Sequence, residues 1–285
     1  MMDLDNLFGV EPDENVVDNA DKIISETRNL LNEKFGDINF IEEGHRYFID
    51  GDEYIPVSNI IKEYEQDVDW DEKAGNYAKR YGRKKEDVQW EWKYNNLKAK
   101  ISGTRTHEFG ESYTNLMSGH PELICNQNKP QYIAEYNILI PTYPKEDAIR
   151  KFYCELEKNL HPIGAEFKLS TKYIPDVRKI CGTCDILFWD SDKKGFVIGD
   201  WKTNAELKKS YIRMNNIMMK YPLTHMFDDA LDHYRIQFNL YRTMLQSIGI
   251  NIVGMILIWL KEDGSYQRIN IDTIDEKTID MLIRK

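Results

Sequence analysis

The chain has 285 residues, of which 41% are hydrophobic, enough to bury a sizeable core as one large domain or one domain with an appendage. No apolar run approaches the roughly 18 residues that a membrane-spanning helix needs, and the N-terminus lacks the pattern of a secretory signal peptide. We therefore expect a soluble protein of the cytoplasm (the host cytoplasm if the source is viral), without a membrane partner.

The acidic charge of the chain is unevenly distributed. The formal net charge is -10. Residues 1–72 contain 5 Lys and Arg against 21 Asp and Glu, a balance of -16, which leaves +6 for residues 73–285. A mildly basic remainder with a locally basic groove is compatible with binding the phosphates of a nucleic acid.

The four cysteines, Cys125, Cys154, Cys181 and Cys184, are too few and too scattered for a disulfide framework. Cys181 and Cys184 have the spacing of a zinc-binding pair. No second Cys or His pair accompanies them, so a zinc site is not expected there.

The N-terminal residues 1–20 are acidic and poor in aromatic side chains, which predicts a flexible or loosely attached tail. An autoinhibitory segment that mimics DNA is the alternative. Apolar side chains at helical spacing from Ile23 to Phe35 predict an amphipathic helix over residues 21–35.

A β-hairpin is predicted next, because the segments 40–49 and 53–56 flank Asp50-Gly51, a strong turn dipeptide. A helix is expected to follow, with Ser58 as its N-cap. His45 lies on the hairpin, and we expect a structural role for it.

From about residue 70 to residue 118 the pattern is helical and unusually rich in aromatic and basic side chains. They are Trp70, Tyr77, Lys79, Arg80, Tyr81, Arg83, Lys84, Lys85, Trp90, Trp92, Lys93, Lys98 and Lys100. Such interleaving suits stacking on unpaired bases together with contacts to the phosphate backbone. The alternative for each residue alone is a core position for the tryptophans and a solvated face for the lysines.

The stretch 102–111 places His107 and Glu111 one helical turn apart on the same face. A neutral imidazole nitrogen can bind a cation, and a nearby carboxylate can orient the ring or serve only in packing. Residues 119–145 are predicted to be strand and loop, and a helix is predicted from about Lys145 to Leu160.

A second hairpin carries the residues with the clearest chemistry. Residues 186–189 and 196–198 are predicted strands, joined by a polar turn over residues 190–195. Antiparallel pairing brings Asp185 and Asp200 within reach of one divalent cation. Strand alternation turns Asp200 and Lys202 to one face and the Trp201 side chain to the other. A surface hairpin that happens to carry two aspartates is the alternative.

Carboxylates suit Mg²⁺ or Mn²⁺, and hydrolysis of a phosphodiester needs such a cation to neutralise developing charge and to deliver hydroxide near neutral pH. The Lys202 ammonium can orient the attacking water and offset negative charge. Burial near a cation could also lower the pKa of Lys202 toward use as a general base.

The C-terminal third contains a basic segment, a helix and a buried strand. Lys208 and Lys209 are expected at the phosphates. A helix is predicted from about Asp228 to Ser247, with Gln237 and Tyr241 on one face. This helix is expected to cross over to a buried strand over residues 252–259, followed by a partner strand near residues 266–271 and a terminal helix from Ile274.

The order of these motifs resembles the PD-(D/E)xK nuclease superfamily, in particular its RecB-like, phage-type exonuclease branch. The matching features are Gly-Thr-x-x-His at 103–107, Gly-x-x-Asp at 182–185, Asp-x-Lys-Thr at 200–203 and Gln-x-x-x-Tyr at 237–241. The resemblance covers roughly residues 40–272.

The resemblance implies roles for particular residues. His107, Asp185, Asp200 and the backbone carbonyl of Trp201 would bind metal, and Lys202 would activate or orient water. Glu166, on a predicted strand at residues 163–169, would bind a second cation or position Lys202.

The resemblance also places Gln237 and Tyr241 close to the active site. Substrate contacts are expected from Arg105, Thr203, Lys208 and Lys209. Some relatives hold an iron–sulfur cluster with a cysteine trio near the C-terminus. No iron–sulfur cluster is expected here, because the last cysteine is Cys184.

We expect an α/β fold with a restriction-endonuclease-like core, a mixed central sheet flanked by helices, and N-terminal helix and hairpin additions. Residues 21–100 would form the additions and residues 101–285 the nuclease core. The expected function is a Mg²⁺- or Mn²⁺-dependent DNA exonuclease in recombination, replication or repair, with a single-strand-binding or recombination protein as a candidate partner. The alternatives are a structure-selective endonuclease on the same core and a non-catalytic DNA-binding protein that retains the fold.

Overall fold

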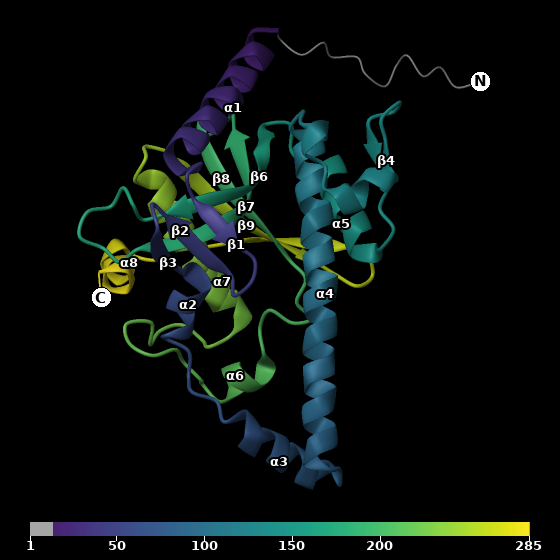
Figure 1. The fold of residues 1–285 in the computed structure, drawn as a ribbon, viewed down its shortest axis with the longest axis vertical. Coiled ribbons are helices and arrows are strands. Elements are labelled where there is room, and N and C mark those ends of the chain that lie inside the picture. Colours follow the sequence, from purple (N-terminus) through teal and green to yellow (C-terminus); the bar gives the residue numbers. More distant parts are fainter. Residues whose placement is uncertain (1–13, 285) are drawn as a thin grey trace.

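The computed structural model describes residues 14–284 and shows a mixed α/β fold in which helices flank a central sheet (Figure 1). The sheet contains β1 (Asn39–Ile41), β2 (Arg46–Ile49), β3 (Asp52–Pro56), β6 (Leu160–Ser170), β7 (Ile180–Asp190), β8 (Gly195–Lys202), β9 (Ile252–Leu260) and β10 (Tyr266–Asn270). Their order is β1-β2-β3-β7-β8-β9-β10, and β6 pairs with β7 outside this path. The predicted mixed sheet with flanking helices is confirmed.

The helices are α1 (Glu14–Phe35), α2 (Val57–Lys62), α3 (Trp70–Tyr81), α4 (Lys85–Met117), α5 (Pro144–Cys154), α6 (Ser210–Met214), α7 (Ala230–Gln246) and α8 (Glu276–Ile283). Two 3₁₀ helices, η2 (Pro121–Leu123) and η3 (Asn126–Gln131), and a small hairpin, β4 (Tyr132–Ile133) and β5 (Ile138–Leu139), connect α4 to α5. None of the helices in the described part of the chain is both long enough and apolar enough to cross a membrane.

The N-terminal hairpin belongs to the central sheet. Strand β3 pairs in parallel with the start of β7, with Ile55 opposite Ile180. Helix α4 runs across the predicted boundary between the N-terminal additions (residues 21–100) and the nuclease core (residues 101–285). These two predicted parts therefore share both the central sheet and a helix.

The expected flexible tail covers residues 1–20. Residues 14–20 are the start of helix α1, residues 1–13 lie outside the described residues, and the flexible tail stays a prediction.

The sheet forks at β7. Cys181 pairs with Ser170 of β6 on one side and Pro56 of β3 on the other. Ile186 pairs with Ala165 of β6 and Gly199 of β8 in the same way. Strands β3 and β8 therefore lie on the same edge of β7, and residues 182–185 lie between them. Asp185 is the last residue before the β7–β8 pairing begins.

Apolar side chains fill both faces of the sheet. On one face, Ile60 of α2, Ile236 of α7 and Leu282 of α8 belong to a single buried cluster. On the other, Phe109 of α4 and Phe152 of α5 pack against strand residues. Burying each such side chain is worth roughly 1.5–3 kcal/mol, so these two layers fix the positions of the strands.

Helices α3 and α4 form an arm that extends from the sheet (Figure 1). Helix α4 has 33 residues, which at a rise of about 1.5 Å per residue gives roughly 50 Å. We call α3 and residues 85–101 of α4 the arm. Its small core contains Ala74, Ala78 and Val88, with Trp92 packed against it. Gly82 links the two helices with a left-handed φ of 61°, a conformation that glycine adopts without strain.

The main connections follow the prediction, and some boundaries differ. Strands β7 and β8 are antiparallel, and β8 and β9 are parallel neighbours joined through α7. Helix α5 ends at Cys154 instead of continuing to Leu160. Helix α2 begins at Val57 without a side-chain cap, so the prediction of Ser58 as N-cap was wrong.

Candidate metal centre

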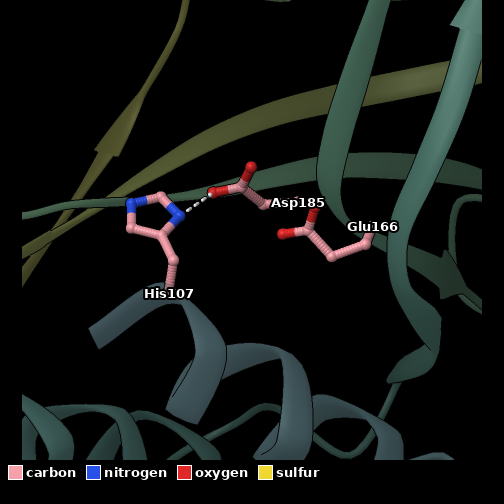
Figure 2. Close-up of side chains that lie close together, drawn as sticks. All are labelled: His107, Glu166 and Asp185. Atoms are coloured by element: carbon pink, nitrogen blue, oxygen red, sulfur yellow. Dashed lines mark ion pairs between the residues drawn. The ribbon is translucent and has the colours of Figure 1, made fainter. Parts of the chain in front are cut away.

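Three side chains from distant segments meet at the fork (Figure 2). His107 comes from α4, Glu166 from β6 and Asp185 from β7. Each offers one ligand atom, and these atoms lie within 4.8 Å of one another. His107 Nδ1 lies 3.0 Å from Asp185 Oδ2. An imidazole nitrogen and two carboxylate oxygens can therefore approach one cation.

Strand pairing explains how Glu166 reaches Asp185. Ala165 opposite Ile186 and Phe167 opposite Cys184 put Glu166 across from Asp185. The φ of Glu166 is 56°, in the left-handed region, which costs a non-glycine residue about 1–3 kcal/mol. Such strain persists where the surroundings impose it, and here it coincides with the cluster of ligand atoms.

Asp200 and Lys202 form the adjacent buried pair. Lys202 Nζ lies 2.7 Å from Asp200 Oδ1, and it also lies over the Tyr234 ring of α7, 4.4 Å from the centroid. Neither carboxylate oxygen of Asp200 accepts a hydrogen bond of regular geometry, so the Lys202 ammonium is the positive group that contacts this buried carboxylate. Buried acceptors in that condition are costly unless a proton or a cation joins them.

The electrostatics divide the acids into two kinds. Burial alone would raise the pKa of Asp185, but His107 and Lys202 hold it below its usual value. Burial, followed by repulsion from Asp185, raises the pKa of both Glu166 and Asp200. Excess negative charge of this kind is relieved by a divalent cation.

Lys202 differs from one sequence-based expectation. Burial acts to lower its pKa, but Asp200 and Asp185 raise it, so that the net shift is upward. With these carboxylates around it, Lys202 is an ammonium ion that donates hydrogen bonds, which suits orienting water better than removing its proton.

Trp201 connects the site to the opposite core. Its backbone amide donates a hydrogen bond to Asp185 Oδ2 at 3.2 Å, while its side chain is buried against Phe152 on the other face, as alternation predicts. Helix α4 packs closely on the indole: a Cβ at Gly110 would lie 2.6 Å from Trp201 Nε1. The expected metal contact of the Trp201 carbonyl stays a prediction, as does that of Asp200, which lies outside the group of three.

Gln237 and Tyr241 form a hydrogen-bonded pair on α7. Gln237 Nε2 donates to the Tyr241 hydroxyl at 3.0 Å, and burial raises the pKa of Tyr241. The Tyr241 ring packs on β7, where a Cβ at Gly182 would lie 2.5 Å from it. The glycine of the Gly-x-x-Asp motif thus leaves space for this aromatic ring.

The four expected substrate contacts lie in different settings. Arg105 is engaged with α5 and the residues before it: Nε donates to Glu146 Oε1 at 3.1 Å, and a second nitrogen donates to Thr142 Oγ1 at 3.0 Å. The backbone carbonyl of Thr203 accepts a hydrogen bond from Lys145 Nζ at 3.0 Å. Lys208 and Lys209 are exposed in the segment between β8 and α6.

Several contacting residues were not identified from the sequence. Tyr234 supports Lys202 from the turn of α7 that precedes Gln237, and the three-residue spacing is the signal that could have found it. Lys145 had no signal, since its contact with Thr203 depends on long-range folding. Glu111 accepts a hydrogen bond from the Cys125 thiol at 3.3 Å, so its position fits a packing role.

The residues present fit a hard divalent cation. One imidazole and two carboxylates are a donor set that suits Mn²⁺ or Mg²⁺, completed in such sites by water or substrate oxygen. Asp200 Oδ2 is buried without a hydrogen-bond partner, while Oδ1 already contacts the Lys202 ammonium. His107, Glu166 and Asp185 could hold the ion, with Asp200 beside them.

No family model matches the chain, and no curated protein matches it. Among solved structures, one described as "Crystal structure of SSO0001" superposes with a TM-score of 0.27 and 18% sequence identity. The alignment covers 47% of this chain, and the chain spans about half the length (50%) of that protein. A similarity of this size does not bear on function.

Proposed function

We propose that the protein is a metal-dependent DNA nuclease of the PD-(D/E)xK type, an exonuclease of phage-type recombination, replication or repair. One observation carries the proposal: His107, Glu166 and Asp185 converge from three distant segments beside the buried ammonium of Lys202. This is the arrangement that phosphodiester hydrolysis needs, with a cation site and a positive donor at one point.

A bound Mg²⁺ or Mn²⁺ would supply positive charge at the scissile phosphate and lower the pKa of a bound water. His107, Glu166 and Asp185 would hold it. The Trp201 amide and His107 both contact Asp185 Oδ2, and they fix the carboxylate in one orientation.

Lys202 would act on the water or on a phosphate oxygen. Its position is set by Asp200 on one side and the Tyr234 ring on the other, so the ammonium has little freedom to reorient. A preorganised donor in a buried site stabilises developing negative charge more than the same group does in water. Tyr241, held by Gln237, would shape the wall of the site next to Gly182.

The proposal is tested by digesting two substrates, an end-labelled linear single strand and a circular single strand. Each is incubated with Mg²⁺ and, in parallel, with EDTA. The linear strand is expected to be degraded only with the metal, and the circle is expected to survive, because an exonuclease needs an end. Absence of cleavage with both Mg²⁺ and Mn²⁺ refutes the nuclease. Cleavage of the circle refutes the exonuclease and supports an endonuclease on the same core.

A further inference from the structure

Helix α4 carries a continuous exposed apolar face on the arm. Trp90, Tyr94, Leu97 and Ile101 are 67%, 52%, 57% and 63% exposed. Spacings of four, three and four residues place them on one side of a helix. A helix of a globular protein normally turns such a face to the core, so a row of large exposed apolar side chains indicates a binding surface.

The face continues into a groove between α4 and the start of α5. The groove has a volume of about 400 Å³, and Tyr94, Leu97 and Ile101 line it from the α4 side. Tyr143, 51% exposed, lines it from the other side, with the Arg105 guanidinium 3.8 Å from its ring centroid. Flat aromatic surfaces and a planar cation are the groups on which bases stack.

The charge of this surface favours a polyanion. Between Trp92 and His107 helix α4 contains no acidic residue, and its basic residues there are Lys93, Lys98, Lys100 and Arg105. The two acids that line the groove are each in contact with a cation: Glu146 with Arg105, and Glu262 with Lys145 at 2.6 Å. At the Trp90 end the charges are mixed, with Glu86, Asp87 and Glu91 nearby, so the basic part of the row runs from Lys93 to Arg105.

The groove adjoins segments that carry the candidate metal centre. Lys145, which lines it, donates a hydrogen bond to the carbonyl of Thr203, the residue after Lys202. On α4, Ile101 precedes His107 by six residues, which is about 9 Å along the helix. Gly103 lies against Thr203, since a Cβ there would lie 3.4 Å from Thr203 Oγ1.

We propose that this surface, the base track (Trp90, Tyr94, Leu97, Ile101 and Tyr143), binds unpaired nucleotides by stacking and leads a single DNA strand to the metal centre. The inference rests on the proposed function and specifies its substrate: single-stranded DNA or an unpaired tail, in preference to intact duplex. The Trp90 and Tyr94 rings are already stacked, 5.3 Å apart and inclined by 7°. In a duplex the base faces are covered by neighbouring pairs, so only an unpaired strand can use such rings.

The test measures DNA binding by fluorescence anisotropy, with the full chain in EDTA so that no strand is cut. The probes are a fluorescein-labelled oligo-dT and a blunt hairpin duplex. Wild type is expected to bind the single strand at least tenfold more tightly than the duplex. The double variant Trp90→Ala/Tyr94→Ala is expected to lose about 10- to 100-fold in affinity for the single strand. The matched control is Tyr136→Ala, another exposed aromatic (64%) outside the track, which should bind as wild type does.

The outcomes separate the track from the nuclease. Unchanged affinity of the double variant, or equal affinity of wild type for both probes, overturns the track. If wild type self-associates in light scattering and the double variant does not, with DNA binding unchanged, the track is also overturned and the face is identified as an interface between copies of the chain. Wild type that binds through the track but cuts nothing with Mg²⁺ or Mn²⁺ keeps the track and refutes the nuclease. Wild type that cuts the strand, with the double variant equally active, keeps the nuclease and refutes the track.

Discussion

The metal centre and the arm are built in opposite ways. In the centre, most charged side chains are buried: Asp185 contacts His107 of α4 and the Trp201 amide of β8, and Lys202 contacts Asp200 and the Tyr234 ring of α7. In the arm, large apolar side chains are exposed, and the two helices are joined by a small core with Trp92 against it and by contacts of Asp71 with Lys85 and Gln89. The comparison teaches that contacts between distant segments fix the positions of the side chains in the metal centre, whereas the exposed contact surface of the arm comes from one long helix, α4.

The largest effect is expected from removing the Lys202 ammonium from the metal centre. Lys202→Ala should lower DNA cleavage by about 100- to 10,000-fold, because a positioned donor is lost from the reacting point. Binding of single-stranded DNA in EDTA should persist, since the base track is intact. Rates from single-turnover digestion, with anisotropy on the same preparation, check both parts. Wild-type rates in the variant would refute the role of Lys202.

The second effect concerns the ligand from the arm's own helix. His107→Ala should weaken Mn²⁺ binding by at least the tenfold to hundredfold that supporting residues of metal sites cost. Isothermal titration calorimetry measures it. His120→Ala is the matched control, because His120 contacts Glu122 and lies outside the cluster. Equal Mn²⁺ affinity in the two variants would show that His107 is not a metal ligand.

Two glycine substitutions on α4 compare a position packed tightly against the Trp201 indole, Gly110, with a position that has space for a Cβ, Gly103. Gly110→Ala should destabilise the fold by about 1–3 kcal/mol, because the new Cβ would lie 2.6 Å from Trp201 Nε1. Gly103→Ala meets only Thr203 Oγ1 at 3.4 Å and should stabilise the helix by up to about 1 kcal/mol. Urea denaturation followed by circular dichroism measures both. The same sign for the two variants would contradict this packing.

The smallest expected effect is a pH dependence of the thermal stability that comes from the metal centre. The pKa of Glu166 is raised by burial, followed by repulsion from Asp185 and Glu111. The group therefore destabilises the fold increasingly as pH rises from its unfolded pKa, about 4.3, toward the folded value. In EDTA, Glu166→Gln should raise the Tm more at pH 8 than at pH 5.

The control for this titration lies on the arm. Glu91 is half exposed and pairs with Arg83, so Glu91→Gln should change the Tm little at either pH. If Glu166→Gln gave the same Tm shift at pH 5 and pH 8, the carboxyl would not be the source of strain in the centre.

The sequence predicted the features that depend on local pattern. Turn residues and alternation predicted the β7–β8 hairpin with Asp185 and Asp200, and helical spacing predicted that Gln237 and Tyr241 share a face. The crossover from β8 to β9 followed from the usual connection of α/β folds.

Features set by distant contacts were not predictable in the same way. The left-handed backbone of Glu166 depends on its surroundings in the sheet, and no local residue signals it. The use of Arg105 to tie α4 to Glu146 and the support of Lys202 by Tyr234 depend on how helices pack on the sheet. The helical pattern over residues 70–118 does not show that a single helix, α4, serves both arm and centre, so the predicted division at residue 100 falls inside that helix.

The most direct test of the account is anomalous diffraction from crystals soaked in Mn²⁺. The account predicts an anomalous peak at the fork of β7, with His107, Glu166 and Asp185 as ligands at about 2.0–2.3 Å. A fully soaked crystal without a peak among these three side chains would contradict it.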